Sequence, residues 1–243
     1  MSDAQTAARS RPRTLEDTVR MVGAVMLDLP RFVTAPLYRR WHRRWGTTPT
    51  ERAARLPGDD VLPGAQYRAT RAITVDAPPA AVWPWLVQVG CRRAGWYSDD
   101  LLDNLARPSA RTIVPELQHL AIGQWVSMSP TPSDATAFKV AGFHVDHWLL
   151  WHKPDSTWVW SLTELDGDRT RLVTRVHAAY DWHRPASALT GVLLMELGDF
   201  AMMRRMLLGI KERAEAGAVH PGAGSSAAAV IEARGRDDPG RSV

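Results

Sequence analysis

Residues 157–180 read TWVWSLTELDGDRTRLVTRVHAAY and give the clearest indication of a fold in this chain. Two runs of alternating aromatic, β-branched and polar residues flank the triplet Asp166-Gly167-Asp168. An Asp-Gly pair between two such runs is a strong signal for a β-hairpin. The sequence therefore predicts two antiparallel strands, over residues 157–165 and 169–182, joined by a tight turn.

More strands of the same kind are predicted upstream of this hairpin. Short runs rich in β-branched and aromatic residues occupy residues 124–128, 137–145 and 147–152, and an earlier run covers residues 67–75. The connections between the later runs are short and contain turn residues such as Lys153-Pro154-Asp155. Because sequential strands joined by short turns pair side by side in opposite directions, we predict one antiparallel sheet.

Two helices are predicted around these strands. The first covers residues 80–89, directly after Pro79, and has Gly90 as its C-terminal cap. The second is long and covers residues 187–216. Its apolar residues recur at spacings of three and four on one face: Leu193, Leu197, Phe200, Met203, Leu207, Ile210 and Ala214. A helix of this pattern must bury a long apolar stripe.

This order of elements predicts an α+β helix-grip fold, in which a curved antiparallel sheet wraps around a long C-terminal helix. The sheet and the helix each have one apolar face, and each face needs the other in order to be buried. A curved sheet and a straight helix do not pack flush. We therefore expect a cavity between them that binds an apolar small molecule.

Composition divides the rest of the chain. Residues 1–13 and 218–243 are small, polar and charged, and we predict that both segments are disordered. Residues 14–45 are predicted to form a basic amphipathic helical arm, residues 46–65 a linker rich in proline and glycine, and residues 66–217 the helix-grip domain.

The arm combines an apolar face with an excess of positive charge. Leu15, Val19, Val22, Met26 and Leu29 share one helical face. Nine arginines lie between residues 9 and 44, against three acidic residues. Such a segment suits either peripheral contact with an anionic membrane or docking on the main domain, and the sequence leaves both open. Nucleic acid is not predicted as a partner, because the chain contains no helix-turn-helix or zinc-finger pattern.

Composition also bounds the location of the protein. Cys91 is the only cysteine, so an internal disulfide and a thiolate metal cluster are both excluded. The first 17 residues lack the apolar core of a secretory signal, and no uncharged apolar run reaches the length of a transmembrane helix. We therefore expect a cytoplasmic protein that contacts the membrane, if at all, peripherally.

Four stretches resemble a known family: RAITVDAPPAAVWPWLVQVG (71–90), RRAGWYSDDLLDN (92–104), TWVWSLTELDGDRTRLVTR (157–175) and MMRRMLLGIKERAE (202–215). Together they resemble the SRPBCC superfamily of START-like and Bet v 1-like proteins, within it an actinobacterial branch, over residues 56–215. The resemblance implies the helix-grip fold. Members of the superfamily include lipid-transfer proteins, plant hormone receptors, polyketide aromatase/cyclases and Rieske oxygenase catalytic domains, so it implies no single function.

The predicted function is binding of a lipid-like or polyketide-like molecule in the internal cavity, as a non-enzymatic carrier or sensor. Eleven tryptophans, against four phenylalanines and four tyrosines, supply apolar area for such a cavity. The residues predicted to bind the ligand are Trp85, Gln88, Trp96, Tyr97, His147, Trp148, Trp160, Arg175, Met202 and Met206. The strand face that carries Trp158 and Trp160 is expected to point inward, because burying tryptophan removes the most apolar area from water.

An enzyme of the aromatase/cyclase type is the alternative. Tyr97, His147, Glu164, Arg175 and His177 would then act as acid, base or oxyanion donor on a polyketide in the same cavity. No catalytic residue, metal or cofactor is assigned. A single cysteine cannot hold the iron–sulfur cluster of a Rieske oxygenase.

The stretch DDLLD, residues 99–103, spells an aspartate pattern that holds magnesium in isoprenoid synthases. Those enzymes are all-helical and have a second acidic motif, whereas this chain is rich in strands. We therefore predict that Ser98 caps a short helix, that Asp99 and Asp100 lie at its positive end, and that Leu101, Leu102 and Leu105 face the core.

Overall fold

The fold was taken from a computed structural model of the 243-residue chain. The structure describes residues 35–183, 185–193 and 198–219, together with residue 195 and nine positions of the predicted arm: 15, 16, 19, 20, 22, 23, 26, 27 and 30. Of the two termini predicted to be disordered, residues 1–13 and 220–243 lie outside the described residues, whereas Ala218 and Val219 are helical.

Six strands form one antiparallel sheet in the order β1-β6-β5-β4-β3-β2. The strands are β1 (Tyr67–Val75), β2 (Trp125–Ser127), β3 (Ala137–His144), β4 (Trp148–Lys153), β5 (Ser156–Leu165) and β6 (Arg169–Ala178). The predicted hairpin is confirmed as β5 and β6, with Gly167 and Asp168 at positive φ in its turn. A register shift between Val140 and Gly142 interrupts the pairing of β3 with β4, and such bulges help a sheet to curve.

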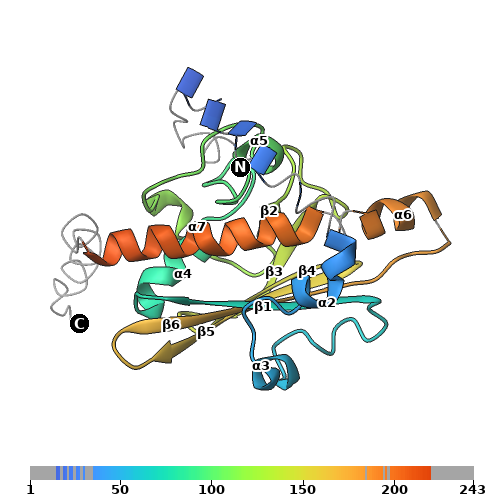
Figure 1. Cartoon of the computed structure of the whole chain (residues 1–243), viewed down its shortest axis with the longest axis horizontal. Coiled ribbons are helices and arrows are strands. Elements are labelled where there is room, and N and C mark those ends of the chain that lie inside the picture. The colour runs from blue at the N-terminus through green and yellow to red at the C-terminus, as the bar shows by residue number, and fades with distance from the viewer. Residues whose placement is uncertain are drawn as a thin grey trace, which may run out of the picture.

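The long helix α7 (Asp199–Val219) crosses one face of this sheet, as Figure 1 shows. Its buried side chains include Met203, Met206, Leu207 and Ile210, which join one hydrophobic core with the inner faces of the strands. The helix α4 (Pro79–Val87) contributes to the same core. The helix-grip prediction is therefore confirmed. The single helix predicted over 187–216 is instead two helices, α6 (Pro185–Leu193) and α7.

The opposite face of the sheet is covered by the segment predicted to be a linker. Within it, α3 (Pro49–Ala53) begins with a capping box between Thr48 and Glu51. Arg171, on β6, donates to both carboxylate oxygens of Glu51. Residues 46–65 thus pack on the sheet as a third layer (Figure 1).

The chain just before this layer lies along β1, which is an edge strand. The short helices η2 (Ala35–Tyr38) and α2 (Arg39–His42) lead into it. The backbone N–H groups of Thr70 and Ala72 donate to the carbonyl oxygens of Arg43 and Trp45. Gly46, at φ +74°, lies so close to the backbone of Ala72 that a side chain at this position would collide with it.

A buried network of charged and polar groups joins this segment to the start of α7. Arg71 is fully buried and donates to the carbonyl oxygen of His42 at 2.8 Å. Its guanidinium lies 2.6 Å from the carboxylate of Asp199, which also accepts a hydrogen bond from the Tyr67 hydroxyl. The ring of His42 stacks on Phe200 with centroids 4.0 Å apart. Three distant parts of the sequence therefore depend on one buried ion pair.

The substitution Asp199→Asn tests this dependence. Asparagine keeps an acceptor for Tyr67 but leaves Arg71 as a buried charge without its counter-ion, so we expect the free energy of unfolding to fall by about 3 kcal/mol. Chemical denaturation measures the change. The control Asp60→Asn removes the partner of Arg55 in an exposed ion pair and should cost no more than about 0.5 kcal/mol. Equal effects of the two substitutions would contradict the assignment.

Candidate functional site

The space between the sheet and α7 is filled by a cluster of tryptophan rings from β4, β5 and the loop after α4. Trp96 stacks on Trp158 with ring centroids 5.7 Å apart and planes within 8° of parallel. The ring centroids of Trp151 and Trp160 each lie 5.1 Å from that of Trp158, and they lie 5.7 Å from one another. The tryptophan face of β5 is therefore the inner face, as predicted, but its rings pack against one another.

The indole N–H groups of Trp151 and Trp160 differ from that of Trp158, because of the three only Trp158 has a hydrogen-bond acceptor in the parts of the chain that the structure describes. The N–H of Trp158 donates to the Thr174 hydroxyl at 2.8 Å, and that hydroxyl donates to the carbonyl oxygen of Val159. Trp151 and Trp160 are 1% and 0% exposed, yet their N–H groups have no hydrogen-bond acceptor among the described residues. Leaving a buried donor without an acceptor costs about 1–3 kcal/mol. Two such donors in one cluster make it the strongest candidate site in the described part of the chain.

The helix α7 presents flexible side chains to this cluster. Met203 and Met206 are buried in the same core, whereas the predicted ligand-binding residue Met202 is half-buried and is not part of it. Methionine has no branched carbon and a polarisable sulfur, so it adapts its shape to its neighbours at low cost. The helix side of the aromatic cluster is therefore deformable, whereas the sheet side is held by the strand register.

The loop GWYS, residues 95–98, closes the cluster at one end. Gly95 has φ +84°, and a side chain there would collide with Ser109. Tyr97 also adopts positive φ, at +57°, and its hydroxyl donates to the carbonyl oxygen of Trp85 at 3.2 Å. Burial raises the pKa of Tyr97, so the phenol stays protonated. This backbone geometry directs the ring of Trp96 into the core and fixes Tyr97 beside Trp85.

Gln88 has a different role from the predicted polar anchor. It is fully buried at the end of α4 and accepts from the backbone N–H of Val114 at 2.9 Å. It also donates to the carbonyl oxygen of Thr112 and accepts from the side chain of Gln118. Its amide therefore holds the loop 112–118 against α4.

Three of the predicted ligand-binding residues lie away from the aromatic cluster. Arg175 pairs with Val159 in the sheet, so its side chain points to the face opposite Trp160. There it forms an ion pair with Asp59 at 2.5 Å and donates to the carbonyl oxygens of Glu51, Arg52 and Ala54.

Trp148 lies on the outer face for the same reason of strand parity, and His147 lies outside the strands. Leu149 is the residue that pairs with Trp160, so Trp148 points outward, where its ring contacts Gly142. His147 is exposed in the turn between β3 and β4. Trp148, His147 and Arg175 were predicted to line the cavity, but their side chains cannot line one pocket with Trp160.

The residues proposed for a cyclase are scattered in the same way. His177 lies on the outer face near Asp59, 3.8 Å from its carboxylate, and burial lowers the pKa of its imidazole. Glu164 is exposed near the end of β5. Tyr97 is the one member of that set in the hydrophobic core.

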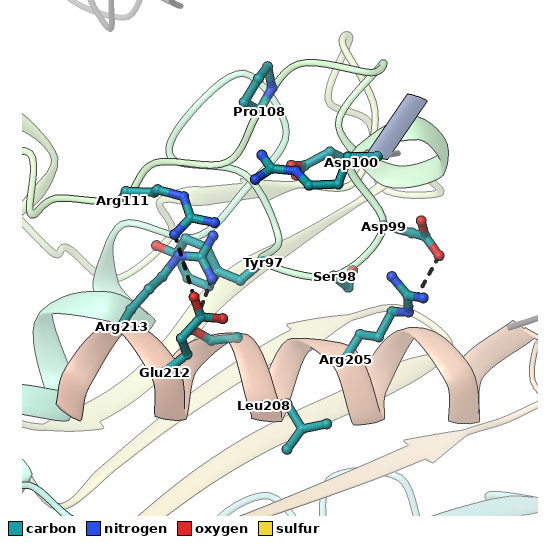
Figure 2. A pocket seen from close by; sticks show the side chains of 12 residues that line it. Tyr97, Ser98, Asp99, Asp100, Pro108, Arg111, Arg205, Leu208, Glu212 and Arg213 are labelled. Carbon is teal, nitrogen blue, oxygen red and sulfur yellow. Dashed lines mark hydrogen bonds and ion pairs between the residues drawn. The ribbon is translucent and has the colours of Figure 1, made fainter. Parts of the chain in front are cut away.

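A separate open pocket of about 280 Å³ lies on the side of α7 away from the sheet (Figure 2). It lies between α7 and the loop that follows Trp96, and arginines and acidic residues line it. Arg205 faces Asp99 at 3.9 Å, and Arg111 faces Glu212 at 3.5 Å. Arg213 donates to the carbonyl oxygens of Ala110 and Gly209. These groups are largely occupied by one another, so the pocket presents no clear excess of one charge.

The DDLLD stretch forms the short helix α5 (Asp100–Asp103), but Asp99 rather than Ser98 is its N-cap. The Ser98 hydroxyl donates to Asp103, and Asp100 accepts from the backbone N–H and hydroxyl of Ser109. The aspartates therefore fix the loop. The prediction that Leu102 and Leu105 face the core was wrong, since both are exposed. Within the described residues, no group of three or more His, Cys, Asp or Glu side chains could hold a metal ion.

Comparison with known proteins gives neighbours only at the level of three-dimensional structure. No protein-family model and no curated protein matches the sequence. Among solved structures, a polyketide cyclase-like protein from Corynebacterium glutamicum is 12% identical over 65% of this chain and 96% of its own, with a TM-score of 0.40. A protein from Mycobacterium smegmatis is 18% identical over 60% of this chain and 88% of its own, with a TM-score of 0.36.

The Zhui aromatase/cyclase from a Streptomyces species is 16% identical over 64% of this chain and 98% of its own, with a TM-score of 0.34. All three TM-scores lie below 0.5, so these similarities assign neither a fold nor a function to this chain. The helix-grip assignment rests on the sheet and helix of this chain.

The pH dependence of stability tests the role of Asp103. Burial, with a contribution from the neighbouring Asp100, raises the pKa of Asp103 to about 7 from an ordinary value of 3.8. Between about pH 4 and about pH 7 the folded state therefore holds a proton that the unfolded state has already lost, so the stability that this group contributes falls over this range and levels off above it. We expect a loss of about 2 kcal/mol between about pH 5 and about pH 8 from this group.

Thermal unfolding of the wild type and Asp103→Asn at both pH values measures this contribution. Asparagine cannot ionise but still accepts from Ser98, so the variant should lose less stability than the wild type over the same interval. Asp134→Asn, at an exposed ion pair with Lys139, is the control and should follow the wild type. If Asp103→Asn also follows the wild type, the carboxyl is not protonated in the folded state.

Proposed function

We propose that this protein binds an apolar small molecule with a hydrogen-bond acceptor, such as a carbonyl or hydroxyl oxygen, in the aromatic core between the sheet and α7. The observation that carries the proposal is the pair of buried indole N–H groups of Trp151 and Trp160 without acceptors among the described residues. Buried polar groups in folded proteins nearly always have a partner, so each exception calls for an explanation.

The chemistry of the core supports this class of ligand. Its lining is aromatic and thioether, so it favours an apolar body, and the indole N–H groups are donors only, so they favour an acceptor. A ligand that accepted from both would recover the cost of two unsatisfied donors. Because the rings already touch one another, binding requires Trp96 or the methionines of α7 to move, and the methionines are the side chains suited to that change.

The alternative of a polyketide cyclase gains no support from the described geometry. Its predicted acid and base residues are divided between the two faces of the sheet and the exposed turns. A carrier or sensor needs only the aromatic core, so binding without chemistry is the function that we propose.

A matched pair of ligands tests the proposal. Fluorene and 9-fluorenone have nearly the same shape, but only the ketone accepts hydrogen bonds. Titration followed by tryptophan fluorescence should show that wild-type protein binds the ketone about fivefold more tightly, the value of one net hydrogen bond. The variant Trp160→Phe keeps a ring but loses the N–H, so the preference should shrink toward unity.

The variant Trp158→Phe is the matched control. The N–H of Trp158 is bonded to Thr174, so its loss should leave the preference for the ketone intact. Equal binding of both ligands by the wild type would remove the role of the indole N–H groups. Binding of neither ligand, together with no copurifying small molecule in native mass spectrometry, would refute the proposed function.

A further inference from the structure

The described positions of the arm show an arrangement that is unusual for a helix next to a globular domain. All nine positions between 15 and 30 that the structure describes are helical. The apolar residues that share one face are exposed: Leu15 is 82% exposed, Val19 64%, Val22 42% and Met26 59%. A helix that docks on a domain normally buries this face.

Among the described positions of the same helix, the polar residue Arg20 meets the domain. Arg20 lines the pocket beside Asp100 and Arg205. Figure 1 shows these arm positions near α5, on the side of α7 away from the sheet. On an α-helix, Arg20 lies about 130° around the axis from the centre of the apolar face. Among the described positions of the arm, Arg20 therefore lies at the pocket, whereas Leu15, Val19, Val22 and Met26 are exposed to solvent.

Further exposed apolar and basic residues lie in and beside η2 and α2. Leu37 and Tyr38 are exposed, and Arg39, Arg40 and Arg44 are exposed beside them. Residues 9–44 contain nine arginines and three acidic residues, so this segment carries an excess of positive charge. We name the exposed residues Leu15, Val19, Val22, Met26, Leu37, Tyr38, Arg40 and Arg44 the arm surface.

We propose that the arm surface binds the surface of an anionic lipid bilayer, with its apolar side chains among the lipid headgroups and acyl chains and its arginines at the phosphates. Exposed apolar residues flanked by arginines suit this environment, because the bilayer surface is apolar within and negatively charged outside. A second copy of the chain would bring the same excess of positive charge against itself. Nucleic acid would satisfy the arginines but leave the apolar residues in water. Within the described part of the chain, no helix is long and apolar enough to cross a bilayer, so contact through the described helices would be peripheral.

Vesicle cosedimentation of the full chain tests this proposal. We expect the wild type to partition to vesicles of phosphatidylcholine with phosphatidylglycerol, less to phosphatidylcholine alone, and less to both as salt is raised. The variant Leu15→Ser/Val19→Ser/Met26→Ser should reduce partition about tenfold or more, because it removes three apolar anchors. The variant Arg40→Gln/Arg44→Gln should also reduce it about tenfold, with the largest effect at low salt.

Matched controls come from exposed positions elsewhere. Ile122→Ser/Val145→Ser removes comparably exposed apolar residues, and Arg55→Gln/Arg107→Gln removes the same charge. Both should partition as the wild type does. As a measurement free of substitutions, backbone hydrogen exchange of residues 15–27 should slow when anionic vesicles are added to the wild type.

Several results would overturn the proposal. One is no partition to anionic vesicles, and another is partition that the triple serine variant leaves unchanged. A doubled mass in light scattering that the serine variant abolishes, without vesicle binding, would instead assign the surface to a second copy. Tight binding to nucleic acid that only the arginine variant weakens, without vesicle binding, would assign it to nucleic acid. Ligand uptake by the aromatic core is independent of all these outcomes.

Discussion

The burial of the apolar stripe of α7 against the tryptophan face of the sheet is the contact on which this structure depends. Leu207 and Ile210 on the helix and Trp151 and Trp160 on the sheet are all almost fully buried. Neither surface could remain in water, because each exposes too much apolar area. The other parts of the molecule keep this contact in place. The network around Arg71 fixes the start of α7, and the loop 95–98 closes against its middle, where Gly209 lets the backbone of Tyr97 approach.

The same contact explains why the site differs from a preformed cavity. A curved sheet over a straight helix leaves space, and in this chain large aromatic rings occupy that space. Tryptophan is a poor choice for a core that only needs to be filled, because its N–H must find an acceptor. Trp158 has one in Thr174, whereas Trp151 and Trp160 have none among the described residues. Under the proposed function, Trp158 serves packing, whereas Trp151 and Trp160 serve recognition of the ligand.

Local patterns in the sequence predicted those parts of the fold that local interactions determine. The Asp-Gly turn located β5 and β6, and the spacing of Leu207 and Ile210 located the inner side of α7. Patterns could not place Arg175, because its partner Asp59 is 116 residues away and only the folded chain brings the two together. The prediction that Trp148 lines the cavity was wrong because Leu149, and not Trp148, pairs with Trp160. Neighbouring residues on a strand point to opposite faces, so Trp148 points outward. For the candidate site, residue type was informative for Trp96 and Trp160, whereas which indole N–H lacks an acceptor needs coordinates.

The hydrogen bonds from Thr70 and Ala72 to the backbone of residues 43 and 45 have a practical consequence for work on shortened chains. β1 has nine residues and stands at one margin of the sheet, and the strand at the other margin, β2, has only three. Removing residues 1–45 would leave the amide groups of β1 open to strands of other molecules. Uncovered strands of that length are where aggregation begins. If a protein truncated in this way precipitates, the cause would therefore be the exposed edge of β1, and not the unfolding of the domain.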